Sequence, residues 1–415
     1  MSRRYEITRI YKKVNRVPCM LYAPVQPDEK SHVAVILMHS GADYFETPQA
    51  LALAERGYLC FTAHIRNAAE TLDDRFLDLL QIVKYAKEYP GVKKVVLFGH
   101  SGGATLMSGY QAIAEKGSSF FQQGRHVINL DEMEEFIPAD GVMLIDANFG
   151  NGVMTLLSMD PAVISEENGV RLDPDLDWLN PANGFDENGN YHYSEDFIKH
   201  YVSEQGKRMN RLIDYAQSRV REIEKGTGLF LDDEPMLIPG GEQMAFCNKV
   251  FPQLIRYFSH TEKAWNLIHQ DDSVTEEIVH CVRDPRKPLN ATCNLRMGAL
   301  QTTVRNFLKS SAVRATPDFH YDETTLYGVD WTSSYCVTVG NSTYITCPML
   351  LMGLTGGYEY IAAEHIWRQA VNCRDKTVAF VEGASHNFTA DKKEYGDTVN
   401  SCFNYVDRWL ESRYL

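Results

Sequence analysis

The sequence predicts an α/β fold in which helices cover both faces of a mostly parallel sheet. Nearly continuous apolar runs of strand length lie at 31–40 and 58–65, which is typical of strands buried on both faces. Helix-like segments at 47–58 and 72–89 alternate with these strands. Strand–helix alternation with short connections is the pattern of an α/β domain with right-handed crossovers.

The alternation continues to residue 150 and returns only near residue 346. A third strand and a Gly-rich turn are predicted first, then a helix and a fourth strand, at 91–103, 104–117 and 140–150. Towards the end of the chain the order is strand, helix, strand, helix, at 346–355, 360–371, 376–386 and 398–413. Residues 1–150 and 346–415 are therefore predicted to form one domain of ordinary size.

The intervening segment, 151–345, has a different character. A strong amphipathic helix is predicted from about 195 to 225, and further helices at about 254–269 and 298–309. Because a structureless loop of this length is uncommon in a compact protein, we interpret the segment as an inserted, mainly helical cap or lid.

Charge and length exclude several classes of protein. The chain has 415 residues, which is enough for a large core without disulfide or metal support. It carries 55 acidic and 41 basic side chains, a formal net charge of −14, whereas a nucleic-acid binder needs clustered Lys and Arg. We therefore expect no nucleic-acid partner.

The cysteines and the apolar runs bear on location. The nine cysteines form no C-x-x-C pair and no Cys/His cluster, which argues against a disulfide framework or a structural zinc site and for a reducing compartment. The first residues lack the apolar stretch of a signal peptide, and no apolar run approaches the roughly 20 residues that cross a bilayer. The expectation is a cytoplasmic protein without a membrane or metal partner; the oligomeric state is not readable.

The most informative motif is Gly99-His100-Ser101-Gly102-Gly103, which matches G-x-S-x-G between a predicted strand and a predicted helix. In this arrangement the serine lies on a tight turn that exposes its hydroxyl, and small flanking residues let strand and helix approach closely. Dinucleotide- and P-loop-type phosphate motifs do not occur in the chain. Ser101 is thus the predicted nucleophile.

A serine hydroxyl needs a base and an oxyanion hole. His386 follows the last predicted strand, where the base of such a site stands in chain order. The Gly102 amide is one expected oxyanion donor, and Gly41 is favoured as the second, with Ala42 as the alternative. Tyr44, on the same loop as Gly41, could add a hydroxyl for substrate binding.

With its GHSGG turn, its HSGA loop after the first apolar strand and its late GASH histidine, the chain resembles the α/β-hydrolase superfamily over 1–150 and 346–415. The resemblance implies a mostly parallel eight-stranded sheet, a cap inserted between its sixth and seventh strands, and an active site between core and cap. It also implies a carboxylate that orients His386.

The family position for that acid is occupied by Gly356 in this chain. Three other carboxylates are candidates. Glu364 is preferred, because it opens the next predicted helix and its long side chain could reach back. Glu359 is the alternative in the loop itself, and Asp146, at the end of the strand 140–146, is the third.

These residues predict a serine hydrolase that cleaves a carboxylic ester or lactone through an acyl-enzyme on Ser101, with no cofactor. A cap of this size favours a medium-to-bulky hydrophobic small molecule as the substrate. Hydrolysis of a carbon–carbon bond of the β-diketone type on the same triad is a second possibility. A non-catalytic ligand-binding protein on a hydrolase scaffold is a third, since one fold hosts many functions.

Overall fold

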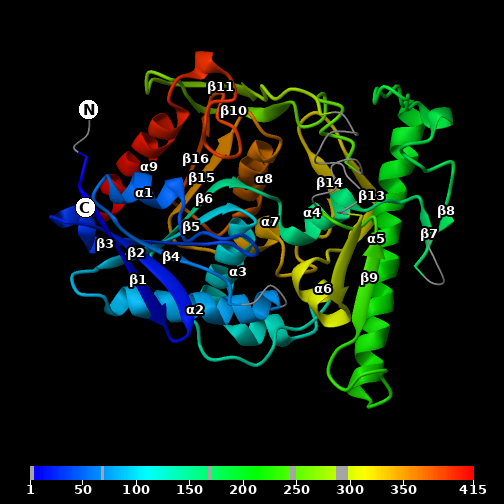
Figure 1. Cartoon of the computed structure of the whole chain (residues 1–415), viewed down its shortest axis with the longest axis horizontal. Helices are drawn as coiled ribbons and strands as arrows, with labels where there is room; N and C mark the ends of the chain where they lie inside the picture. Colours follow the sequence, from blue (N-terminus) through cyan, green and yellow to red (C-terminus); the bar gives the residue numbers. More distant parts are fainter. Residues whose placement is uncertain (1–3, 67–69, 167–170, 244–248, 287–297) are drawn as a thin grey trace.

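The computed structural model describes residues 4–66, 70–166, 171–243, 249–286 and 298–415. Its centre is a ten-stranded sheet with the order β1-β2-β4-β3-β5-β6-β15-β16-β10-β11 (Figure 1). The neighbouring strands from β4 to β10 pair in parallel. The pairs β1–β2 and β2–β4 at one end and β10–β11 at the other are antiparallel. The expected α/β class with a mostly parallel sheet is confirmed.

The bounds of the sheet strands follow the apolar runs closely in the core. They are β1 Ile7–Val14, β2 Val17–Pro24, β3 Val33–Met38, β4 Leu59–Ala63, β5 Lys94–Ser101, β6 Gly141–Ala147, β15 Met349–Leu354, β16 Lys376–Val381, β10 His260–Ile268 and β11 Val274–His280. Every residue of β3, β4, β6 and β15 is buried, as the continuous apolar pattern requires.

Helices cover both faces of the sheet. Along β3, Val33, Val35 and Leu37 pack with helices α1 (Pro48–Ala54) and α9 (Thr398–Tyr414). Ala34 and Ile36 face the other layer, which contains α2 (Leu72–Glu88), α3 (Gly103–Lys116) and α8 (Ala362–Gln369). Since successive side chains of a strand point to opposite faces, one apolar strand feeds both cores.

The segment 151–345 is less helical than its sequence predicts. Helix α5 (Glu195–Glu224) confirms the predicted long helix, and it lies along the side of the molecule opposite β1 and β2 (Figure 1). The helix predicted at 254–269 is wrong, since this stretch contains β10, which pairs in parallel with β16. The segment predicted as a helix at 298–309 is part strand, β12 (Ala299–Thr303), and part helix, α6 (Val304–Ser310). The sheet therefore has ten strands rather than eight.

The remaining described elements of this segment are short. They are α4 Asn151–Ser158, β7 Val163–Ser165, β8 Arg171–Leu172, β9 Pro235–Pro239, β13 Ala315–Tyr321, β14 Leu326–Val329 and α7 Thr338–Asn341. Strands β9 and β12 form one small antiparallel sheet, β13 and β14 another, and β7 and β8 a third. A separate cap formed by 151–345 stays a prediction, because two of its strands continue the main sheet.

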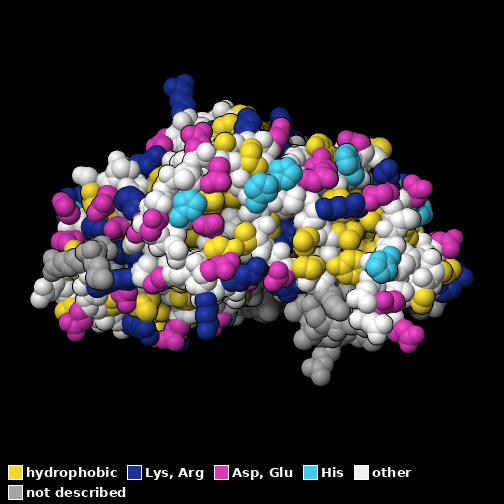
Figure 2. Space-filling view, turned by 90° about the horizontal axis from the view of Figure 1, so that it is seen from above, with side chains coloured by type: hydrophobic (Ala, Val, Ile, Leu, Met, Phe, Trp, Pro, Cys, Tyr) yellow, Lys and Arg dark blue, Asp and Glu magenta, His cyan; other side chains and the backbone are white. Residues whose placement is uncertain are grey.

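Acidic and basic side chains are interspersed over the face shown in Figure 2. Among the described residues, no helix combines the length and the apolar character that a membrane span requires.

Candidate active site

Ser101 lies on a sharp turn between β5 and α3. Its φ is +54°, a left-handed conformation that is rare for a residue with a side chain. A Cβ atom on Gly99 would lie 2.7 Å from the Cα of Ala104, so only glycine lets the strand and the helix approach this closely at that position. The turn has the geometry that the G-x-S-x-G motif predicts.

The start of α3 also packs tightly against the loop after β3. A Cβ atom on Gly103 would lie 2.9 Å from the carbonyl oxygen of Met38, and one on Gly102 would lie 2.8 Å from Ser40 Oγ. The backbone of Gly102 therefore lies against the predicted oxyanion loop. Because the first amides of a helix have no partner within the helix, they are available to an anion.

His386 lies on the loop after β16 and contacts the acid at the end of β6. Its Nδ1 is 2.6 Å from Asp146 Oδ2. Asp146 is fully buried and has a φ of +46°, and its Oδ1 accepts a hydrogen bond of 2.9 Å from the Leu354 amide. The carboxylate is thus fixed by the backbone of the neighbouring strand β15 while its other oxygen faces the imidazole.

The chain brings Ser101 close to this pair through its neighbours. Ser101 pairs with Ala147 in the β5–β6 register, directly after Asp146. The ring centroids of His100 and His386 are 4.5 Å apart, and His100 Nε2 lies 2.8 Å from the His386 carbonyl oxygen. The turn at Ser101, Asp146 and the loop of His386 therefore lie at the carboxyl ends of β5, β6 and β16.

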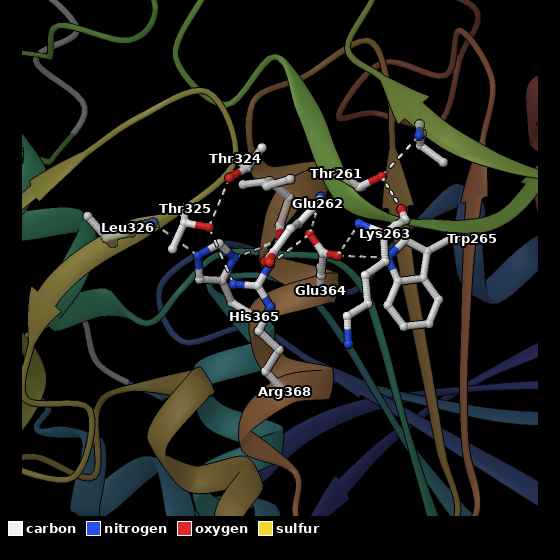
Figure 3. A network of polar contacts seen from close by, with 12 residues as sticks. Thr261, Glu262, Lys263, Trp265, Thr324, Thr325, Leu326, Glu364, His365 and Arg368 are labelled. Carbon is white, nitrogen blue, oxygen red and sulfur yellow. Dashed lines mark hydrogen bonds and ion pairs between the residues drawn. The ribbon is translucent and has the colours of Figure 1, made fainter.

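Glu364, the preferred acid of the sequence analysis, lies elsewhere, and this placement corrects that preference. Its carboxylate accepts hydrogen bonds from the Glu262 and Lys263 amides and from Trp265 Nε1, at 3.0, 3.1 and 3.0 Å (Figure 3). Arg368 lies 3.2 Å from it, and the side chain is fully buried. The carboxylate holds α8 against β10 and is not directed at His386.

Glu359, the alternative acid, is close to His386. Its Oε2 lies 3.2 Å from His386 Nδ1, and its side chain is 12% exposed. Two carboxylates therefore face one imidazole nitrogen, with Asp146 the closer of the two. The sequence makes Asp146 only the third candidate. The feature that points to it is its position at the end of a predicted buried strand.

The predicted second oxyanion donors are engaged in another contact. The Gly41 and Ala42 amides both donate to His39 Nδ1, at 2.9 and 2.7 Å. This contact corrects the expectation that the Gly41 amide is open to a ligand. It also fixes the tautomer of His39, because Nδ1 accepts two hydrogen bonds and cannot carry a proton.

Tyr44 is not placed to bind a substrate. It is buried, its ring stacks on His39, and its hydroxyl lies 2.5 Å from His100 Nδ1. The hydroxyl donates to this nitrogen if His100 Nε2 donates to the carbonyl of His386. Tyr44 therefore supports His100, which in turn contacts the loop that carries His386.

Two cavities adjoin the site. One of about 430 Å³ is lined by Ser101, Gly102 and the loop at Gly41, and another of about 350 Å³ is lined by His386. Tyr358 and Glu359 line both. A bound molecule of moderate size could therefore contact both the serine and the region of the histidine.

The pKa of His386 is shifted in the opposite direction from the pKa values of the neighbouring His39 and His100. Burial disfavours a charged His386, but Glu359 and the hydrogen bond to Asp146 outweigh it and raise the pKa of His386 from 6.5 to about 9. Burial lowers the pKa of His39 to about 4 and the pKa of His100 well below its usual range. Protonation at this site is therefore concentrated on His386.

A metal ion is a poor fit to these donors. The nearest nitrogen and oxygen atoms of His100, Asp146 and His386 lie within 4.8 Å of one another. Asp146 Oδ2 and His386 Nδ1 already bond to each other, and His100 bonds to Tyr44 and to the His386 carbonyl, so all three side chains have protein partners.

A mostly parallel sheet, a serine at positive φ on the strand-to-helix turn and a His–Asp pair beside it define an α/β-hydrolase fold. No family model and no curated protein sequence matches the chain.

Several solved structures resemble the chain over nearly its whole length. A thermostable carboxyl esterase from Bacillus coagulans shares 10% identity at a TM-score of 0.44, covering 99% of both chains. Esterase B from Lactobacillus rhamnosis shares 9% identity at a TM-score of 0.43, covering 99% of this chain and 89% of that one. Est1E from Butyrivibrio proteoclasticus shares 11% identity at a TM-score of 0.40, covering 97% and 98%. These similarities are too weak to assign a function, so the fold and the site are assigned from the geometry of this chain.

Proposed function

We propose that the protein is a serine hydrolase that cleaves a carboxylic ester through an acyl-enzyme on Ser101. The observation that carries the proposal is the 2.6 Å contact between His386 Nδ1 and buried Asp146, beside a serine held at positive φ on a strand-to-helix turn. A nucleophile, a base and an acid that orients the base are the parts that acyl transfer requires.

In this mechanism Ser101 Oγ attacks the ester carbonyl carbon while His386 Nε2 takes the hydroxyl proton. Asp146 accepts a hydrogen bond from the Nδ1–H, which keeps the imidazole in the tautomer with Nε2 free, and it stabilises the imidazolium that forms. His386 then returns the proton to the leaving alcohol. Water attacks the acyl-enzyme with His386 again as the base, which releases the acid and restores Ser101.

The Gly102 amide supports the oxyanion, because it lies at the start of α3 directly after the nucleophile. Gly41 or Ala42 can supply a second donor only if its N–H leaves His39 Nδ1. Rotation of the His39 ring on substrate binding would free both amides together.

The lining of the cavity at Ser101 favours a polar substrate over the hydrophobic one expected from the sequence. Around Ser101 it presents mainly side-chain amides, hydroxyls and charged groups, including Asn148, Asn151, Gln301, Asn306, Ser310, Arg75 and Lys249. Met154 and Leu300 are among its few aliphatic members. Because polar groups in a cavity orient a bound molecule and give specificity, an ester with several oxygen atoms fits this lining better than a hydrocarbon chain. With about 430 Å³, the substrate is of medium size.

A fluorophosphonate probe tests the mechanism directly, since it labels a serine only where a neighbouring base activates it. We expect labelling at Ser101 that is lost in Ser101→Ala and kept in Ser108→Ala, a matched serine on α3 that hydrogen-bonds to the Thr105 carbonyl. Absence of labelling at Ser101 in the folded protein would overturn the proposal and favour a ligand-binding protein on the same scaffold.

A panel of polar esters, apolar esters, lactones and β-diketones separates the possible reactions. We expect the highest kcat/KM with polar esters and none with Ser101→Ala. Preferential turnover of a β-diketone would replace the ester by a carbon–carbon bond, while turnover retained in Ser101→Ala would contradict the mechanism as a whole.

A further inference from the structure

His386 faces two carboxylates rather than one. Asp146 Oδ2 and Glu359 Oε2 lie 2.6 and 3.2 Å from the same nitrogen, Nδ1. They come from different elements, since Asp146 is the last residue but one of β6 and Glu359 opens the short helix Glu359–Ile361 after β15. One imidazole N–H can donate a short hydrogen bond to only one of them, and the geometry gives that bond to Asp146.

One oxygen of the second carboxylate is buried without a hydrogen bond. Among the described residues, Glu359 Oε2 has no hydrogen-bond partner, and its side chain is 12% exposed. A buried carboxylate without hydrogen bonds is costly unless an opposite charge compensates it. The nearest opposite charge is His386 in its protonated form.

The charged and titratable groups of the surrounding elements act in both directions. Burial raises the pKa of Glu359 and Asp146 adds to this rise, while His386 and Lys249 act against it by favouring the ionised carboxylate. Arg286 opposes protonation of His386, and His39 and His100, on the loop after β3 and on β5, are held neutral by burial. Glu359 and His386 therefore titrate as a coupled pair.

We propose that Glu359 is a positioning residue that acts through His386: Asp146 orients the imidazole, and Glu359 stabilises the proton on it and so sets the pH range in which it can act as a base. The inference rests on the proposed function for its effect on catalysis. The contact between Glu359 and His386 stands independently of that function.

The proton balance defines the consequence. A resting imidazolium must first lose its Nε2 proton to solvent before it can accept the proton of Ser101, and Glu359 makes this loss harder. Once His386 has been neutralised and takes the serine proton, Glu359 stabilises the new imidazolium. The same carboxylate therefore lowers the rate at neutral pH and raises it at high pH.

The test is the rate of fluorophosphonate labelling of Ser101 from pH 5 to 10, in the wild type and in Glu359→Gln. We expect the midpoint of the profile to fall by about 1 to 3 pH units, the shift that a nearby opposite charge produces. The variant should label faster than the wild type near pH 7 and more slowly above pH 9. A purely structural role would lower the rate at every pH without moving the midpoint.

Glu382→Gln is the matched control. Glu382 forms an equivalent carboxylate–imidazole contact, 2.7 Å from His269 Nδ1, outside the residues assigned to the reaction. Its profile should coincide with that of the wild type. If Ser101 of Glu359→Gln is labelled with the same midpoint as the wild type, the role of Glu359 is overturned and the proposed function is left intact.

Titration of His386 by NMR of 15N-histidine-labelled protein gives a readout without activity, with the resonance assigned by its loss in His386→Gln. We expect a wild-type midpoint near the pKa of about 9 and a lower one in Glu359→Gln. Should Ser101 not label at any pH, this titration still decides the role of Glu359. A wild-type midpoint near the ordinary 6.5 overturns the inference even if the variant does not fold.

Discussion

The ends of two neighbouring strands, β6 and β15, carry acids with different surroundings. The strands pair in parallel from Met349–Val142 to Met352–Ile145, so both finish on the side of the sheet that carries the turn at Ser101 and the loop of His386. Asp146 reaches His386 from the end of β6 itself. After β15, Glu359 approaches the same nitrogen less closely, and Glu364 points away from it.

Backbone contacts account for the difference. The φ of +46° at Asp146 and the Leu354 amide on its Oδ1 fix a short side chain in one direction. The longer Glu364 is held by amides of β10, a strand that comes from the middle of the chain. Which carboxylate contacts His386 is thus decided by the backbone amides that hold each carboxylate in place.

The largest expected effect is that of Asp146→Asn. Asparagine is nearly isosteric but does not hold the Nδ1 proton, so we expect the labelling rate of Ser101 to fall by about 10³- to 10⁴-fold. Glu364→Gln is the paired comparison and should label within about twofold of the wild type once folded. The reverse result, with Glu364→Gln inactive and Asp146→Asn active, would refute the assignment of the acid.

Glu364→Ala should affect stability instead of activity. It leaves two backbone amides, an indole N–H and Arg368 without their buried acceptor, which costs about 3 to 5 kcal/mol of unfolding free energy. Denaturant unfolding measures the loss. Glu262→Gln removes the exposed partner of the same Arg368 and should cost at most about 1 kcal/mol. Equal losses in the two variants would show that burial of Glu364 is not what stabilises this contact.

We expect the labelling rate of the wild type to be highest at basic pH. Because the base form of His386 is needed and its pKa is raised to about 9, the labelling rate should increase with pH through this value. At pH 7 it should lie about 100-fold below its plateau. A plateau already reached near pH 7 would show that the two carboxylates do not hold the proton on His386.

The smallest effect is expected for Tyr44→Phe. The change removes the hydroxyl that contacts His100 Nδ1, at a net cost of about 0.5 to 1.5 kcal/mol, and we expect only a several-fold fall in labelling rate. Tyr22→Phe, which removes a different buried hydroxyl contact, to the Phe45 carbonyl, is a control with no expected effect on rate. A loss comparable to that of Asp146→Asn would place Tyr44 in direct contact with substrate.

Much of the site could be predicted because two of its positions depend on local pattern. Ser101 stands on a turn that needs glycine at Gly99, and His386 follows the last strand of the parallel series. The role of Asp146 could not be predicted in this way. Its side chain contacts His386 only because the backbone at Asp146 has a positive φ. The engagement of the Gly41 amide by His39 is likewise a contact that spacing does not reveal.

The fold shows the same division between local and distant information. Strands such as β3 and β15 are apolar throughout, because both of their faces are buried, and their runs predict them well. Strand β10 is mixed in character, with Thr261, Leu267 and Ile268 buried and exposed residues between them, so its residues resemble an amphipathic helix. Its strand conformation comes from pairing with β11 and β16, which both come later in the chain.

The order of strands also has a consequence for synthesis of the chain. β6 is buried along its whole length and sits between β5 and β15, yet β15 is made only after the entire segment 151–345. A nascent chain therefore presents β6 as an uncovered apolar edge until Met349 has left the ribosome, and such an edge pairs readily with other chains. Slow translation of the middle segment should increase aggregation, and chaperones that shield strand edges should relieve it.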